Sequence, residues 1–484
     1  MTPDLAPITA ALTRVDDLVW EIPAAARPDM RVPARVFADA ELIDAIRDDL
    51  SLWQLANVAT LPGITGAAIA MPDIHQGYGF PVGTVAATVL PDGVISPGGV
   101  GYDINCGVRL LALDMDRREL GDAVAPLMAE LARAVPAGTG RGGRVPLTAD
   151  RLRAVLRNGA PEAVRMGLGR DDDLACTESG GRLGEGDPDA VSERAAARGR
   201  DQLGTLGSGN HFLELQHVTR ITDRDAARAY GLRDGQVTVL IHTGSRGVGH
   251  QVCTDHVRLM DARLPAWGID LPDRQLACAP ASSPEGRAYL AAMACAANFA
   301  WANRQAIAHR VREAVAHVLG PRHADGVRQV YDVAHNVAKR EEHGGAEVLV
   351  HRKGATRAFG PARAAELPPA YRHVGQPVFI PGSMGTASWV LAGADGSLDV
   401  SFGTACHGAG RRLSRGAARR RVTGAALRRE LESRGIVVRC PTGAGLAEEA
   451  PFAYKDVDRV VDVVARAGIA RTVARLEPLG VLKG

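Results

Sequence analysis

The sequence has few aromatic residues, few cysteines and almost no net charge. Among its 484 residues only 4% are aromatic and seven are cysteine, and the formal net charge is +2. A charge so close to neutral does not by itself indicate a protein that binds nucleic acid. The cysteines are odd in number and show no CxxC spacing, so a disulfide framework is excluded and a reducing compartment is favoured.

The sequence also lacks a long hydrophobic run. Its longest apolar stretch, residues 288–302, contains Asn298 and is too short to span a bilayer. The N-terminus carries acidic residues early, and it lacks the basic and apolar regions of a signal peptide. We therefore expect a cytoplasmic protein with no membrane partner.

Short apolar runs between glycines dominate the chain from residue 61 onward and predict buried strands joined by tight loops. A helix is predicted over 39–59, and a long one from Ser283-Pro284, with serine as the N-cap, to Gly320. No internal repeat or linker is visible. Because the candidate ligands described below lie far apart and must converge, we expect one large, intertwined α+β domain over 1–484. Central β-sheets would be flanked by helices, and 1–60 would form a less distinctive lead-in.

Five potential metal ligands stand in glycine-rich or strand-like settings. Asp103 and Cys106 lie in GGVGYDINCGVRL, His211 in GTLGSGNHFLEL, His242 in IHTGSRGVGHQ and His335 in YDVAHNVAKRE. A lone cysteine or histidine is more often structural, but five such residues in matched settings favour a metal centre. They can hold two divalent ions if the thiolate bridges them, an arrangement suited to phosphoryl chemistry. Thiolate and imidazole suit zinc, and the added aspartate leaves manganese open.

His407 differs from these histidines because it follows a predicted strand and opens the loop HGAGRR. A neutral imidazole beside a metal-bound phosphate is a competent nucleophile toward phosphorus. The alternatives are a sixth metal ligand or a structural histidine. The loops at 381–389 and 407–411 expose N–H groups suited to phosphate, although neither matches a P-loop or a dinucleotide motif.

An arginine-rich segment follows His407 directly. Residues 411–421 contain six arginines in eleven positions. A run of like charges is usually a solvated helix face. The neighbouring histidine motif favours contacts between these arginines and phosphate.

With these residues assembled, the chain resembles the RtcB family of RNA-splicing ligases from about residue 60 to its end. The blocks that carry the resemblance, in family order, are MPDIHQGYGFPVG, GGVGYDINCGVRLL, QLGTLGSGNHFLEL, IHTGSRGVGHQ, AHNVAKRE, PGSMGTASWVL, HGAGRRLSR, EAPFAYKDVD and PLGVLKG. The resemblance implies an RtcB-like fold. It also implies a GTP- and manganese-dependent enzyme of tRNA splicing or RNA repair that joins RNA 3′-phosphate or 2′,3′-cyclic phosphate ends to 5′-hydroxyl ends.

The resemblance further implies roles for individual residues. Asp103, Cys106 and His211 would hold one Mn²⁺, and Cys106, His242 and His335 the second. His407 would take GMP from GTP, pass it to the RNA 3′-phosphate, and the 5′-hydroxyl would then displace it. The implied guanylate pocket comprises Asn210, His211, Phe212, Leu213, Glu214, His335, Asn336, Pro381, Gly382, Ser383, Met384, Ser388, His407, Gly408, Ala409, Gly410 and Lys483. Arg246, Arg411, Arg412 and Arg415 would contact RNA phosphates.

We expect a monomer that acts on RNA, with an archease-type activator as a potential further partner. Two other functions compete with the ligase. A two-metal phosphoesterase or cyclic phosphodiesterase would use the same ligands without covalent guanylylation. A metal-stabilised RNA-binding module would catalyse nothing, but binding alone requires neither a bridging cysteine nor a histidine beside a glycine-rich loop.

Overall fold

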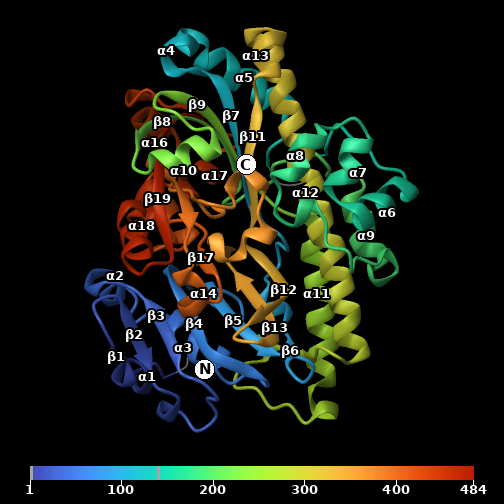
Figure 1. The fold of residues 1–484 in the computed structure, drawn as a ribbon, viewed down its shortest axis with the longest axis vertical. Coiled ribbons are helices and arrows are strands. Elements are labelled where there is room, and N and C mark those ends of the chain that lie inside the picture. Colours follow the sequence, from blue (N-terminus) through green and yellow to red (C-terminus); the bar gives the residue numbers. More distant parts are fainter. Residues whose placement is uncertain (1–3, 139–141) are drawn as a thin grey trace.

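Two large β-sheets form the centre of the molecule, with helices packed around them (Figure 1). The structure is a computed structural model that describes residues 4–138 and 142–484. The strands of the first sheet, in spatial order, are β1 (Thr13–Arg14), β2 (Val19–Ile22), β3 (Ala34–Phe37), β4 (Ile64–His75), β5 (Val82–Val89), β13 (Ala346–Lys353) and β12 (Asn336–His343). The prediction of an α+β fold with central sheets is therefore confirmed.

The second sheet carries most of the candidate site. In spatial order its strands are β11 (Arg328–Ala334), β7 (Gly107–Asp116), β9 (Gln236–Thr243), β8 (Phe212–Ile221), β19 (Ala470–Lys483), β16 (Ser388–Gly393) and β15 (Pro377–Ile380), and β18 (Val437–Arg439) pairs with β19. Every residue of β9 is buried, including His242. A short pair, β14 (Ala355–Arg357) and β17 (Thr404–Cys406), leads into His407.

The predicted long helix is present as α12 (Pro284–Leu319), which begins where Ser283 caps the backbone N–H of Gly286. Figure 1 shows α12 rising along one side of the molecule, and it packs against α5 (Val124–Ala134), α6 (Ala149–Asn158), α7 (Ala160–Arg165) and α11 (Arg246–Arg263). This packing buries the apolar stretch 288–302. Within the described ranges, no helix has the length and apolarity needed to cross a membrane.

The prediction of one helix over 39–59 is wrong. The segment forms two helices, α2 (Ala40–Asp44) and α3 (Leu50–Val58). The Asp39 carboxylate caps the first and the Asp49 carboxylate caps the second by accepting from Ser51 N–H. Aspartate favours helix starts over helix interiors because its side chain competes for backbone N–H groups.

The order of four neighbouring strands explains why distant ligands converge. In the strand order β11, β7, β9, β8 each strand is antiparallel to its neighbour, with Ala334 opposite Gly107, Gly107 opposite Thr243 and His242 opposite Phe212. The ends of β11 and β9 therefore lie beside the starts of β7 and β8. Each of these ends carries one or more of the predicted ligands.

Candidate active site

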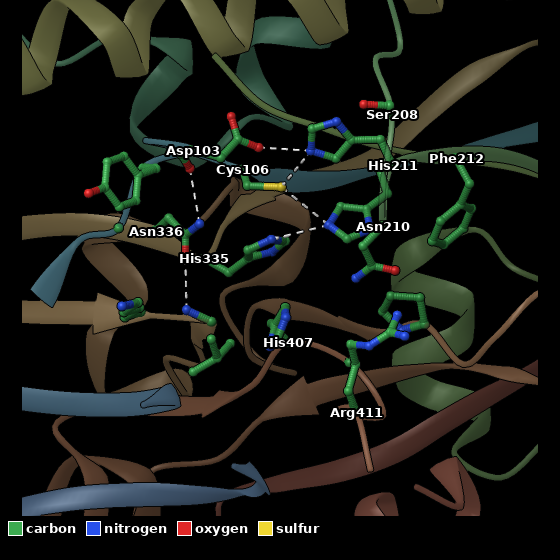
Figure 2. Close-up of a pocket in the computed structure, with 18 of the residues that line it drawn as sticks. Asp103, Cys106, Ser208, Asn210, His211, Phe212, His335, Asn336, His407 and Arg411 are labelled. Carbon is green, nitrogen blue, oxygen red and sulfur yellow. Dashed lines mark hydrogen bonds and ion pairs between the residues drawn. The ribbon is translucent and has the colours of Figure 1, made fainter. Parts of the chain in front are cut away.

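The five predicted metal ligands form one cluster at these strand ends. The Cys106 Sγ lies 3.4 Å from the Nε2 atoms of both His211 and His242. The Asp103 carboxylate lies 2.8 Å from His211 Nε2, and the Nε2 atoms of His242 and His335 are 3.2 Å apart. Figure 2 shows the thiol and imidazole groups pointing toward one another. The cluster contains two trios, Asp103–Cys106–His211 and Cys106–His242–His335, that share the thiol.

The chemistry of this donor set fits a pair of divalent cations. Burial holds the pKa of His242 and of His335 well below the ordinary value, so both imidazoles are neutral and have a lone pair to offer. Burial, and then the charge of Asp103, raises the pKa of the Cys106 thiol. Without a metal the protonated thiol is therefore favoured. A bound cation would favour the thiolate instead, because a coordinating thiol is deprotonated outright. Within each trio the donor atoms lie within 4.8 Å of one another.

A buried guanidinium braces three of the segments that carry ligands. Arg304, fully buried in α12, donates to the backbone oxygens of Asn105 at 2.8 Å and Thr243 at 2.9 Å, and to the Asp332 carboxylate at 2.9 Å. These acceptors stand next to Cys106, next to His242 and three positions before His335. Gly107 is required here, because a Cβ would lie 2.3 Å from the Val333 backbone oxygen and 2.9 Å from the Arg304 guanidinium. Sequence reasoning missed Arg304, which lies inside an apolar helix.

His407 follows β17 and lies against the ligand cluster, with its ring centroid 4.7 Å from that of His335. Its Nδ1 is 2.7 Å from a carboxylate oxygen of Asp73, a fully buried residue that sequence reasoning also missed. Lys455 Nζ donates to the carbonyls of Pro72 and Ile74 on either side of Asp73, at 3.0 and 2.5 Å. With Nδ1–H donated to Asp73, the free lone pair of a neutral His407 imidazole lies on Nε2.

A single cavity of about 760 Å³ joins the ligand cluster to His407 and the loop that follows it. That volume lies in the range of small-molecule sites. Of the residues predicted for the guanylate pocket, those that line this cavity are Asn210, His211, Phe212, His335, Asn336, Pro381, Gly382, His407, Gly408, Ala409 and Gly410. Gly410 has φ +76°, and a Cβ there would lie 2.2 Å from the Asp73 carbonyl oxygen, so glycine is needed in the loop that follows His407.

An adjoining recess contains Ser383, Met384 and Lys483 together with Asn210, Phe212 and Gly382. Glu449 and Tyr454, which were not predicted, complete it. Burial alone would raise the pKa of Glu449, but Lys483 and Arg411 hold it at about 2. A permanently charged carboxylate therefore faces Lys483, whose Nζ is 3.7 Å away.

The remaining residues predicted for the guanylate pocket, Leu213, Glu214 and Ser388, line neither the cavity nor the recess. Ser388 Oγ accepts from Gln216 at 3.0 Å and from the Gly382 N–H at 3.4 Å. Burial raises the pKa of Glu214 to about 8. Leu213 packs into an apolar cluster on the far side of β8. Glu214 and Ser388 thus stand behind the cavity surface, and Leu213 points away from it.

The four predicted RNA-binding arginines differ in position. Arg246, Arg411 and Arg415 line the cavity, and they are joined there by Arg198, which was not predicted. Arg412 is exposed and lies outside the described lining. Arg411 and Arg415 both pair with Glu449, at 3.1 and 3.2 Å.

Comparison with known proteins agrees with this geometry. The family model described as tRNA-splicing ligase RtcB matches residues 54–484. Proteins named tRNA-splicing ligase RtcB from Thermococcus kodakarensis and Archaeoglobus fulgidus are 55% and 52% identical over 478 residues, covering 98% of this chain and 99% of each relative. A Mycobacterium tuberculosis protein named RNA-splicing ligase RtcB is 53% identical over 439 residues, covering 89% of this chain and 100% of the relative. The chain therefore belongs to the RtcB family of tRNA-splicing ligases.

Proposed function

We propose that this chain is a GTP- and Mn²⁺-dependent RNA ligase. It joins RNA 3′-phosphate or 2′,3′-cyclic phosphate ends to 5′-hydroxyl ends in tRNA splicing or RNA repair. The observation that carries the proposal is the position of His407. Its ring lies against the shared-thiol cluster, it is held by Asp73, and it opens into a cavity that also contains the glycine-rich loop after it.

In the first step His407 Nε2 attacks the α-phosphorus of GTP, an N–P bond forms and pyrophosphate leaves. The Asp73 carboxylate stabilises the positive charge that develops on the imidazole and keeps the ring in the reactive tautomer. The guanine would occupy the part of the large cavity that borders the recess, where Asn210 and Phe212 line both.

A 2′,3′-cyclic phosphate would first be hydrolysed, with water breaking the P–O2′ bond and leaving a 3′-phosphate and a 2′-hydroxyl. In the second step an oxygen of the RNA 3′-phosphate displaces His407 from GMP, which gives an RNA(3′)pp(5′)G end and restores the free imidazole. In the third, the 5′-hydroxyl oxygen attacks the phosphorus of the RNA phosphate and GMP leaves. Two ions held by Asp103, Cys106, His211, His242 and His335 would supply Lewis-acid charge to these phosphates.

We further propose that the enzyme acts as a cytoplasmic monomer, and that an archease-type activator is an additional partner. The cysteines of the described chain are free, which fits a reducing compartment. Arg246, Arg411, Arg412 and Arg415 would contact RNA phosphates, with Arg412 reaching the strand outside the cavity.

The test is a joining assay with two RNA strands, one ending in a 2′,3′-cyclic phosphate and the other beginning with a 5′-hydroxyl. With Mn²⁺ and GTP the two strands should become one product, and omission of GTP or the His407→Ala substitution should abolish it. A phosphoesterase would instead hydrolyse the cyclic phosphate without joining and without a need for GTP. That result would overturn the proposal.

A further inference from the structure

Three aromatic rings from separate segments meet at the wall of the cavity. They are Tyr78, after β4, Tyr102, before β7, and His250, in the first turns of α11; we call them the aromatic patch. The Tyr78 and Tyr102 rings meet edge to face at 5.1 Å, and the Tyr102 and His250 rings lie 4.8 Å apart at 33°. Tyr102 and His250 both line the cavity.

The exposure of these tyrosines distinguishes them from the others. The chain has seven tyrosines, and the other five, Tyr230, Tyr289, Tyr331, Tyr371 and Tyr454, are all buried. Only Tyr78 and Tyr102 remain partly exposed, and they touch each other beside the candidate metal ligands. In a protein with so few aromatic residues, core packing does not explain why two partly exposed tyrosines touch each other beside the cavity.

The backbone that presents Tyr78 is held on both sides. Gln54 exchanges two hydrogen bonds with Gly77, at 2.8 and 3.0 Å, and Gln275 accepts from the Gly79 N–H at 3.0 Å. Buried Lys353 donates to the carbonyls of Tyr78 and Phe80. The ring is therefore presented by a fixed loop, which lowers the entropic cost of binding against it.

Tyr102 is fixed in a similar way. The preceding residue, Gly101, donates its N–H to the Pro97 carbonyl at 2.8 Å. The next residue, Asp103, accepts from Asn336 through its backbone oxygen at 3.0 Å. A nucleobase bound on Tyr102 would thus lie beside the residue that begins the ligand cluster.

The patch shares its cavity with Arg198, Gln202 and Arg246. Side chains that contact phosphates beside exposed aromatic rings are the combination by which proteins hold single-stranded nucleic acid, with bases stacked on the rings. The residues that border both the cavity and the recess, where the guanine is proposed to lie, do not include Tyr78, Tyr102 or His250, so the patch lies in another part of the cavity wall.

We infer that the aromatic patch is a nucleobase subsite, on which the unpaired base at a reacting RNA end stacks. This inference rests on the proposed RNA ligase function and names how its substrate is recognised. The same chemistry can serve the terminal base of the 3′-phosphate strand or that of the 5′-hydroxyl strand, and the test distinguishes the two.

The experiment measures binding of short RNA strands to the full chain loaded with Mn²⁺. Each strand is prepared intact and with an abasic site at its reacting terminal nucleotide. Loss of one stacked base should weaken binding of one of the two strands roughly 5- to 100-fold, and that strand identifies the end that uses the patch. Equal affinities for intact and abasic forms of both strands would overturn the inference without any variant being made.

Variants then assign the effect to the patch. In Tyr102→Ala the preference for the intact strand should disappear, whereas Tyr102→Phe should keep it. Phe452→Ala, which removes an exposed aromatic ring outside the described cavity lining, should also keep it. Guanylylation with labelled GTP should continue in all three variants. Its loss in Tyr102→Ala would show that the residue acts through Asp103, and would refute the subsite.

The two proposals fail in different ways. If the wild-type protein neither guanylylates itself nor joins RNA, the ligase function is wrong, whatever the abasic strands show. If it joins RNA but does not distinguish intact from abasic ends, the ligase function stands and the nucleobase subsite is wrong.

Discussion

The ligand cluster and the arginine-rich segment at 411–421 lie close to His407 but are built in opposite ways. In the cluster, His242 and His335 are buried, and the neighbouring backbone of Thr243 accepts from Arg304, which also donates to the Asp332 carboxylate. In the part of the arginine segment that forms α15 (Arg415–Arg421) the charges are largely exposed, and Arg415 and Arg419 pair with Glu449 and Glu448.

This difference sets how much one side chain can matter. When a substitution leaves a buried polar group without its partner, the loss of stability exceeds the net contribution of the original hydrogen bond, because water cannot reach the group to replace that bond. An exposed ion pair contributes about 0–1 kcal/mol. Single substitutions in the cluster or in its buried supports should therefore have large effects on activity. Single substitutions of the exposed arginines in α15 should have small ones.

The largest effect is expected for Cys106→Ala. The substitution removes the one donor that both trios share, so the protein should bind less than one Mn²⁺ per chain. Joining activity should fall by more than about 100-fold, because loss of a residue that only hydrogen-bonds to a metal ligand already costs about 10- to 100-fold. Metal content by elemental analysis checks this. Cys295→Ala, which removes another free and buried cysteine, should retain both ions. Equal metal content in the two variants would contradict a shared thiolate.

Asp73→Asn should have the next largest effect, and on chemistry rather than on metal. The substitution removes the negative charge 2.7 Å from His407 Nδ1, so guanylylation should slow by roughly 10²- to 10⁴-fold. Mn²⁺ content should be unchanged. The rate of label uptake from GTP at saturating Mn²⁺ is the measurement, and a wild-type rate would exclude Asp73 from positioning His407.

Arg304→Lys should weaken metal binding by about 10- to 100-fold, because lysine cannot maintain all the bonds to Asn105, Thr243 and Asp332. Arg109→Lys is the matched control. Arg109 is also fully buried and also bonds to Asp332, but its other hydrogen bond is with Gln305 and not with the backbone beside Cys106 or His242. Both variants should lose thermal stability. Only Arg304→Lys should also change the Co²⁺–thiolate absorption band, and an identical change in both would refute a specific role.

Arg415→Ala should have the smallest effect, a loss of up to about tenfold in RNA affinity and a salt dependence shallower by about one phosphate contact. Arg412→Ala compares a neighbouring arginine that lies outside the described cavity lining, and its effect should be smaller still. Guanylylation should persist in both. A larger loss for Arg412→Ala would place the RNA path outside the cavity.

The sequence predicted the site better than it predicted the supports of the site. Asp103, Cys106 and His407 stand in distinctive glycine-rich segments, so they could be named as candidates before the fold showed that they lie together. Asp73 could not be paired with His407, from which it is separated by 334 positions. Its block, MPDIHQGYGFPVG, marked the segment as distinctive without giving the carboxylate a partner.

Arg304 was hidden for a related reason. It lies within a helix whose apolar composition predicts burial, and its partners become neighbours only when β7, β9 and β11 align. The helix expected over 39–59 was wrong because a local cap at Asp49 outweighed a weak helical pattern. The residue pattern therefore did not predict which side chains pair across the fold, or where a capping residue divides a helix.

The most direct test of the central claim is incubation with α-labelled GTP and Mn²⁺, followed by denaturing electrophoresis of the wild type and His407→Ala. We predict an acid-labile, alkali-stable label on the wild type alone, as a histidine phosphoramidate requires. No label despite bound metal, or a label that persists in His407→Ala, would contradict the account.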